Sequence, residues 1–159
     1  MASVVSLLWL MFGGALGAIC RYLTQELIVR GTRLPGWVSI FVANVLGSFL
    51  IGLAAASLQH KIAAADLQHL ASLSHVLVTH PFEQGLAILV IGFCGAYTTF
   101  SSFSLDNYFL VQGKYVQLAL NMLGSLVIAF LAVWAGWSLG QMLSACRALP
   151  RTWLWKNLS

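Results

Sequence analysis

The chain has 159 residues, of which 60% are hydrophobic and 8% are charged, and its formal net charge is +4 at pH 7. A soluble domain has about 25% charged and about 45–50% apolar residues, so this composition excludes an ordinary soluble enzyme, a nuclease and a secreted disulfide scaffold. We expect an integral membrane protein that has membrane lipid as a partner and no nucleic-acid partner.

Four stretches without a charged residue indicate four membrane spans. Each has at least 20 residues, which is enough to cross a hydrocarbon core of about 30 Å as a helix. The fold class predicted is therefore all-α, with one domain over residues 1–159 and no soluble catalytic module. The transmembrane helices are predicted at about 4–28, 36–58, 84–110 and 115–144, with an interfacial connection at about 59–83.

The first predicted helix carries Gly13, Gly17 and Arg21 at intervals of four residues, so the three share one face. Its 20 uncharged residues exceed the hydrophobic region of a signal peptide, which has about 7–15 residues, so we interpret it as a transmembrane helix. The glycine spacing is typical of close helix packing in membranes. Arg21 either extends its side chain to the membrane interface or attracts anions.

The second predicted helix has a narrow stripe of small and polar residues on an otherwise apolar surface. The stripe consists of Asn44, Gly47, Ser48, Ile51 and Ala55. Asparagine in a membrane helix is commonly used for hydrogen bonds between helices, and a polar stripe also suits a narrow polar pathway. Both interpretations remain open from the sequence.

The connection at about 59–83 contains all four histidines of the chain. The spacing of its apolar residues favours a short amphipathic helix that lies at the membrane interface. The histidine spacings match no common zinc pattern, so we expect solvated or interfacial histidines.

The third predicted helix places two glycines and five hydroxyl residues at mid-membrane depth, between Gly92 and Ser104. Glycine and consecutive threonines are weak helix formers, so we expect this helix to be broken. Broken helices in transporters use their freed carbonyls to bind a cation near the midplane. Phe100 and Phe103 are expected to share a face with Tyr97, interleaved with hydroxyl donors. Ordinary packing is the alternative role for these aromatic residues.

The fourth predicted helix repeats a motif of the second, because Asn121-Met122-Leu123-Gly124-Ser125 matches Asn44-Val45-Leu46-Gly47-Ser48 at four of five positions. Both helices run in the same direction, and each asparagine lies near the start of its span. We therefore expect the two amides at similar depth.

The distribution of basic residues barely distinguishes the two sides of the membrane. The side with both termini holds Lys61, Arg147, Arg151 and Lys156, and the other holds Arg30, Arg33, Lys114 and, at the helix end, Arg21. An excess of Lys and Arg on the cytoplasmic side sets orientation, and here the excess is one or zero. Either this weak bias selects one orientation, or the chain inserts both ways and pairs as an antiparallel dimer.

Three motifs occur together in the first three helices. They are Gly13-Gly14-x-x-Gly17-Ala18-x-x-Arg21-Tyr22, Asn44-x-x-Gly47-Ser48-Phe49, and Gly92-Phe93-Cys94-Gly95 followed by Thr98-Thr99-Phe100-Ser101-Ser102-Phe103-Ser104. With these motifs the chain resembles the small bacterial fluoride channels of the Fluc or CrcB family, and the resemblance covers essentially all four helices.

The resemblance implies a fluoride-selective channel that exports fluoride passively across the bacterial inner membrane and so reduces fluoride toxicity. It also implies an antiparallel, dual-topology homodimer with two fluoride pathways and a central sodium ion that is structural and not transported. Backbone carbonyls of Gly95 and Thr98 from both copies would bind the sodium ion. The pore residues implied are Phe100, Phe103 and Asn44, with Arg21 in the vestibule.

The chemistry of fluoride agrees with these assignments. Fluoride is small and strongly hydrated, so a pore must replace its water with closely placed donors. The amide of Asn44 and the hydroxyls of Thr99, Ser101 and Ser125 can supply them, and the positive edges of phenylalanine rings can face an anion. Family members often have tyrosine where this chain has Met122, so the chain lacks that phenol.

Other protein classes fit the sequence less well. A small dual-topology multidrug exporter is the main alternative, but it would need a membrane-embedded carboxylate, and every Asp and Glu lies outside the four uncharged stretches. A non-transporting scaffold protein would leave the hydroxyl and aromatic residues of the third helix unexplained. An enzyme is not expected, because the spans contain no acid–base pair and no nucleophile with a base.

Overall fold

The structure is a computed structural model that describes residues 4–32, 34–62 and 81–148, and every regular element in these residues is a helix. The helices are α1 (Val4–Thr32), α2 (Gly36–Ile62), α4 (Pro81–Tyr97), α5 (Phe100–Leu110) and α6 (Tyr115–Ala148). Three of them, α1, α2 and α6, are long and apolar enough to cross a membrane. The chain is therefore a helical, multi-pass integral membrane protein.

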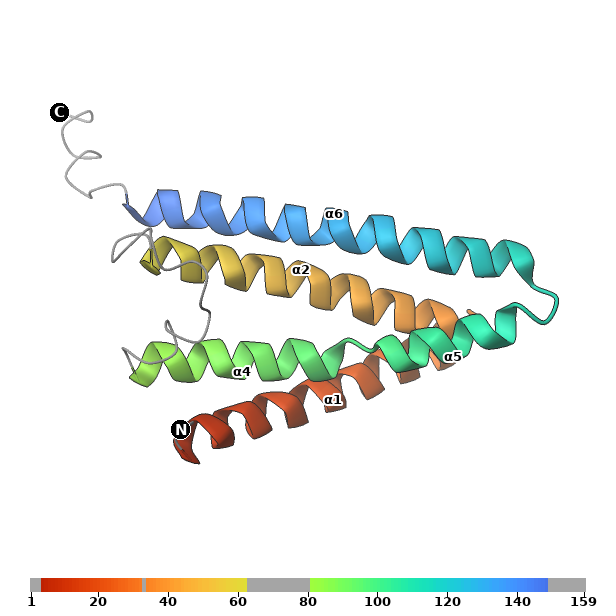
Figure 1. Ribbon diagram of the computed structural model, residues 1–159, viewed down its shortest axis with the longest axis horizontal. Coiled ribbons are helices and arrows are strands. Elements are labelled where there is room, and N and C mark those ends of the chain that lie inside the picture. Colours follow the sequence, from red (N-terminus) through yellow and green to blue (C-terminus); the bar gives the residue numbers. More distant parts are fainter. Residues whose placement is uncertain (1–3, 33, 63–80, 149–159) are drawn as a thin grey trace.

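The helices form a bundle in which the chain passes back and forth along one axis (Figure 1). α1 and α2 run in opposite directions, α4 and α5 follow the direction of α1, and α6 follows the direction of α2. The start of α1 and the end of α6 consequently lie at the same end of the bundle. Most of the predicted interfacial connection, residues 63–80, lies outside the described residues.

Three helices extend beyond their predicted ends. α1, α2 and α6 end at residues 32, 62 and 148, four residues after the predicted ends at 28, 58 and 144. Charged residues end an apolar stretch without ending a helix. In the last two turns of α1, for example, Glu26 and Arg30 form an ion pair of 2.6 Å at the i, i+4 spacing that supports a helix.

Glycines bring the helices together in two close pairs, α1 with α4 and α2 with α6. A Cβ atom at Gly17 would collide with the carbonyl oxygen of Phe93 on α4, and one at Gly136 would collide with the carbonyl oxygen of Phe49 on α2. Lipid tails are as apolar as leucine, so membrane helices associate largely through such close backbone contacts. The glycine pattern of α1 therefore serves helix packing in this structure.

Large apolar side chains lie mainly on the outside of the bundle. The side chains of Leu126 and Phe130 on α6, for example, are 72% and 73% exposed. In water such exposure would be costly, but in a bilayer the surrounding lipid is itself apolar. The buried side chains are mostly small or polar, such as Ala43, Ala56 and Ser39.

Two residues, Thr98 and Thr99, separate α4 from α5. Thr99 has an extended backbone (φ −153°, ψ 121°), and its hydroxyl accepts a hydrogen bond from the Ser102 N–H, which makes Thr99 the N-cap of α5. α5 then continues in the direction of α4 (Figure 1). Together α4 and α5 occupy the predicted position of the third span, 84–110, and neither helix alone is long enough to cross the membrane.

Candidate functional site

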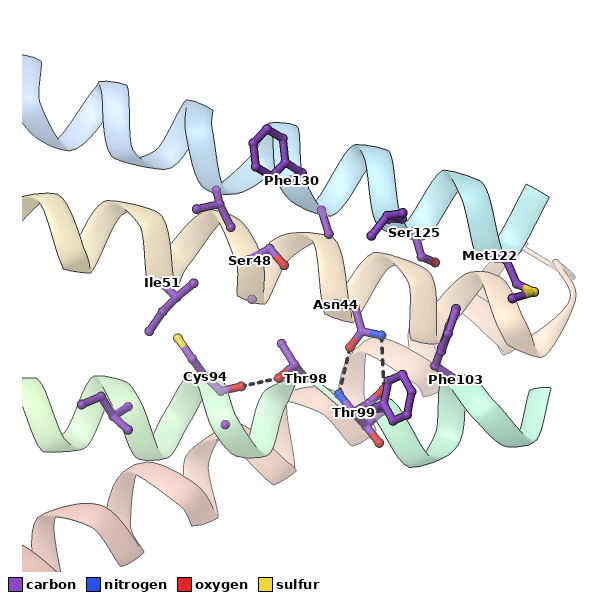
Figure 2. Close-up of a pocket in the computed structure, with 17 residues that line it drawn as sticks. Asn44, Ser48, Ile51, Cys94, Thr98, Thr99, Phe103, Met122, Ser125 and Phe130 are labelled. Atoms are coloured by element: carbon purple, nitrogen blue, oxygen red, sulfur yellow. Dashed lines mark hydrogen bonds between the residues drawn. The ribbon is translucent and has the colours of Figure 1, made fainter. Parts of the chain in front are cut away.

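An open groove of about 900 Å³ runs between α2, the α4–α5 junction and α6. Its side chains project from all of these helices toward one another (Figure 2). Most of the lining is apolar, and the polar residues gather near the junction. The polar lining residues are Asn44, Ser48, Thr98, Thr99 and Ser125, and the aromatic ones are Phe100, Phe103 and Phe130.

The amide of Asn44 holds the backbone at the junction. Its Oδ1 atom accepts a hydrogen bond from the Thr99 N–H at 2.8 Å, and its Nδ2 atom donates to the Thr99 carbonyl at 3.2 Å (Figure 2). Thr99 is 8% exposed, so these bonds satisfy backbone groups that would otherwise be unpaired in an apolar setting. One N–H of the Asn44 amide remains available, because an amide nitrogen carries two.

Backbone carbonyls at and just after the end of α4 lose their helical donors at this junction, and those of Gly95 and Thr98 are among them. In a continuous helix the Gly95 carbonyl would accept from Thr99 N–H and the Thr98 carbonyl from Ser102 N–H. Instead Thr99 N–H donates to Asn44 Oδ1, and Ser102 N–H donates to the hydroxyl of Thr99 at 3.3 Å. Both carbonyl oxygens are hard ligands of the kind that bind alkali cations.

Gly95 presents an open backbone to the groove. A Cβ atom built on Gly95 would meet no heavy atom within 4 Å, unlike those on the packing glycines of α1 and α6. The adjacent Thr98 uses its hydroxyl locally, because Oγ1 donates to the Cys94 carbonyl at 2.9 Å. The proton of the Thr98 hydroxyl is therefore held within α4 and is not directed at the Thr98 carbonyl.

The hydroxyls at the start of α5 form a small network around Thr99. The Thr99 and Ser101 hydroxyls lie 3.1 Å apart in a hydrogen bond, and the Thr99 hydroxyl donates to Ser102 Oγ at 3.2 Å. Of these three residues only Thr99 lines the groove. Ser101, a predicted pathway residue, is thus connected to the groove through Thr99.

Phe100 and Phe103 form an aromatic pair on the wall of the groove. Their ring centroids are 5.8 Å apart with an interplanar angle of 38°. Phe100 is 79% exposed in the single protomer, and it belongs to the same wall as Thr99 at the start of α5. The pair therefore presents ring surface and ring edges beside the polar junction.

The expectation that Tyr97 shares this face is wrong. Tyr97 is buried on the α1 side, where its ring stacks on Phe93 at 5.5 Å and its hydroxyl lies 3.1 Å from Thr24 Oγ1. The interval from residue 97 to residue 100 predicts a shared face only in a continuous helix. The two non-helical residues between α4 and α5 change the phase, so Tyr97 and Phe100 point to different neighbours.

The two asparagines of the repeated motif do not occupy equivalent places. Asn44 lines the groove, whereas Asn121 is 1% exposed, does not line the groove, and donates from Nδ2 to Asn107 Oδ1 at 2.8 Å. Asn44 thus binds Thr99 and Asn121 binds Asn107. These two partners are eight residues apart, which is about 12 Å along a helix. The expectation of similar depth is therefore wrong.

Other predicted residues lie at different places around the groove. Ser125 lines it, and its hydroxyl donates to Asn121 Oδ1 at 3.4 Å. Arg21 lies half-buried on α1 and does not line the groove. None of the described groove residues is acidic, and Asp106 on α5 is outside the lining.

Sequence reasoning missed the α6 wall of the groove beyond Ser125. Leu126, Phe130 and Val133 line it, and their i, i+4, i+7 spacing places the three on one face of α6. The signal for this face is weak, because α6 is apolar on all sides. Asn107 was also missed, since a single amide beside Asp106 near the end of a span indicates nothing without its partner on α6.

All the residues that line the groove lie within the part of the chain that is similar to known proteins. Residues 8–137 match the family model described as CrcB-like protein, Camphor Resistance (CrcB). The chain is 37% identical over 130 residues to a Vibrio parahaemolyticus protein named fluoride-specific ion channel FluC, a match that covers 80% of this chain and 87% of the relative. A protein with the same name from Vibrio campbellii is 38% identical over 130 residues, which cover 80% of this chain and 87% of the relative. Another from Solibacter usitatus is 38% identical over 128 residues, which cover 78% of this chain and 88% of the relative.

Proposed function

The chain belongs to the CrcB-like family, and on that premise we propose that it forms a fluoride-selective channel that lets fluoride leave a bacterial cell passively through the inner membrane. The observation that carries the proposal is the groove in which the Asn44 amide, the Thr99 junction and the Phe100–Phe103 pair lie together. The names of the relatives supply the anion.

The groove offers fluoride replacement for its hydration shell. Asn44 keeps one amide N–H beyond its bonds to Thr99. The Ser125 hydroxyl lies on the opposite wall and would donate to fluoride in place of its long, 3.4 Å bond to Asn121 Oδ1. Phe100 and Phe103 have positive ring edges that can face an anion without forming a strong bond. Such weak, successive contacts suit conduction, which requires an ion both to enter and to leave. Arg21 at the end of the apolar part of α1 would raise the local anion concentration at the vestibule.

The functional unit in this proposal is an antiparallel homodimer with two pathways. Phe100 is largely exposed in one protomer, and the groove between α2, α5 and α6 is open. A second copy would cover these surfaces and complete the pathways. The nearly equal numbers of basic residues on the two sides of the membrane allow insertion in both orientations.

A structural sodium ion fits the α4–α5 junction. The Gly95 and Thr98 carbonyls, both without their helical donors, would hold it together with the same carbonyls of the second copy. The bound cation would supply fixed positive charge near the two anion pathways. Gly95 suits this role because its backbone is open on the groove side.

The alternative of a multidrug exporter is not favoured. Proton-coupled export needs a carboxylate that faces the substrate, and the described groove lining contains none. Passive export is sufficient for protection, because hydrogen fluoride enters from acidic surroundings and dissociates in a more neutral cytoplasm.

The test is fluoride efflux from proteoliposomes that contain the purified protein, measured with a fluoride electrode in the absence of a pH gradient. We expect efflux that follows the electrochemical gradient of fluoride, and no comparable efflux of chloride. Obligatory proton countertransport, or equal chloride efflux, would overturn the assignment.

A further inference from the structure

α5 carries the aromatic pair but has little apolar packing of its own. It has 11 residues, and Leu110 is its one buried residue. Within the protomer its side chains therefore make few apolar contacts that could fix its position. The hydrogen bonds that tie α5 to α2 and α6 are the specific contacts that hold it there.

Two amide side chains supply such bonds, one near each end of α5. At the N-terminal end, Asn44 of α2 binds both backbone groups of Thr99. Toward the C-terminal end, Asn121 of α6 donates to Asn107 at 2.8 Å. Phe100 and Phe103 lie between these two anchors in the sequence of α5.

The repeated motif of α2 and α6 accounts for this arrangement. In each copy the asparagine binds α5 or its N-cap, and the serine four residues later, Ser48 or Ser125, lines the groove. The asparagine and the serine lie one helical turn apart on the same side of their helix. One face of each helix therefore both holds α5 and borders the groove.

Asn121 is suited to holding α5 and poorly placed to touch a permeating ion. It is 1% exposed and outside the groove lining, and its Oδ1 atom accepts from Ser125 while its Nδ2 atom donates to Asn107. A buried amide whose partner is removed is costly, because its polar atoms lose both water and a hydrogen bond.

We propose that Asn121 and Asn107 form a positioning pair that fixes the C-terminal half of α5 and thereby holds the Phe100 and Phe103 rings in place. The pair does not contact the ion. This proposal rests on the proposed function only in that the rings border the fluoride pathway. The anchoring of α5 by the pair is a property of the fold and does not depend on which ion is conducted.

The test compares single-channel fluoride currents of purified dimers in planar bilayers. Asn107→Leu and Asn121→Leu are each expected to lower the current about tenfold, roughly the factor associated with one lost buried hydrogen bond. The double variant is also expected to fall only about tenfold, because both changes remove the same bond, whereas independent effects would multiply to about 100-fold. Asn107→Gln retains the acceptor and should keep the current within about twofold of the original.

Gln117→Leu is the matched control, since Gln117 carries the same amide group one turn before Asn121 on α6 but is only half-buried. It should conduct as the unmodified protein does. If Asn121→Leu fails to assemble, the contrast between Asn107→Leu and Asn107→Gln decides, because Asn107 is only half-buried.

Hydrogen exchange of the α5 amides gives a readout that is independent of fluoride. Exchange in α5 should accelerate in the leucine variants, with that of α2 unchanged. Unaltered α5 exchange, unaltered currents or multiplicative losses would each overturn the positioning pair. An unmodified protein that carries no fluoride would overturn the proposed function instead, and the exchange measurement would still decide whether the pair anchors α5.

Discussion

Gly95 is the position at which the structure of one protomer and the proposed sodium site lead to opposite expectations. A Cβ atom at Gly95 would meet nothing within 4 Å, whereas one at Gly17 would lie 3.0 Å from the backbone nitrogen of Tyr97 and would collide with the Phe93 carbonyl oxygen. Within the protomer, Gly95→Ala should therefore be tolerated and Gly17→Ala should not.

The magnitudes make the contrast measurable. Overpacking a tight contact costs about 1–3 kcal/mol, and Gly17→Ala should lose at least that much stability. Replacing glycine by alanine in a helix favours the helix by about 1 kcal/mol, so Gly95→Ala should be neutral or slightly stabilising. Gly95 lines the groove, so a loss of fluoride flux at position 95 must then come either from a side chain that narrows the groove or from what lies against α4 outside the protomer. Only the second cause changes the response to sodium.

We predict that Gly95→Val lowers fluoride flux at least about tenfold, because about 1.4 kcal/mol of crowding corresponds to that factor. The added side chain would press on the second copy's backbone and disturb the shared carbonyls. The assay is fluoride efflux from proteoliposomes prepared without sodium and measured before and after sodium is added. Thermal unfolding of the same samples reports whether the protein is folded.

Gly124→Ala is the control for this series. Its Cβ atom would lie 3.6 Å from Phe41 Cε2, an ordinary contact, so its flux and its response to sodium should match those of the unmodified protein. A folded Gly95→Val variant with normal flux, together with unmodified protein whose flux does not depend on sodium, would refute the sodium site.

Four further substitutions probe the junction and the rings. Phe100→Ile and Phe103→Ile should strongly reduce fluoride efflux in dimers that still assemble by size-exclusion chromatography, and normal efflux would assign the rings to packing alone. Asn44→Ala should lower the free energy of unfolding by about 2–6 kcal/mol, because two backbone groups of Thr99 lose their partners at about 1–3 kcal/mol each; an unchanged denaturation midpoint would contradict this. Thr98→Ala should be milder than Gly95→Val in the efflux assay, since the proposed ligand is the carbonyl and the hydroxyl bonds only within its own chain segment.

Local sequence patterns predicted the spans and one wall of the groove. Hydropathy located α1, α2 and α6, because a span is recognised from a continuous run of apolar residues. Helical periodicity placed Asn44, Gly47, Ser48 and Ile51 on one face of α2, and all four line the groove. Both properties depend on residues within a few turns of one another, so they can be read without knowing the rest of the fold.

Periodicity failed where the helix is interrupted. The prediction for Tyr97 assumed that residues 97–103 are one helix, and the extended backbone at Thr99 changes the direction of every side chain after it relative to those before. The sequence indicated that a break was plausible in this segment. It did not indicate the rotation across the break, which depends on the bonds that Asn44 makes to Thr99.

The sequence by itself therefore determined that two asparagines lie in apolar spans and need partners, and the tertiary structure decided what those partners are. Asn44 binds a backbone 55 positions away, and Asn121 binds a side chain 14 positions away on a different helix. The two copies of one motif acquire different roles because their helices pack against different parts of α5. Hydropathy and periodicity are local, whereas the partner of a buried amide is set by helices that come together only when the bundle has formed.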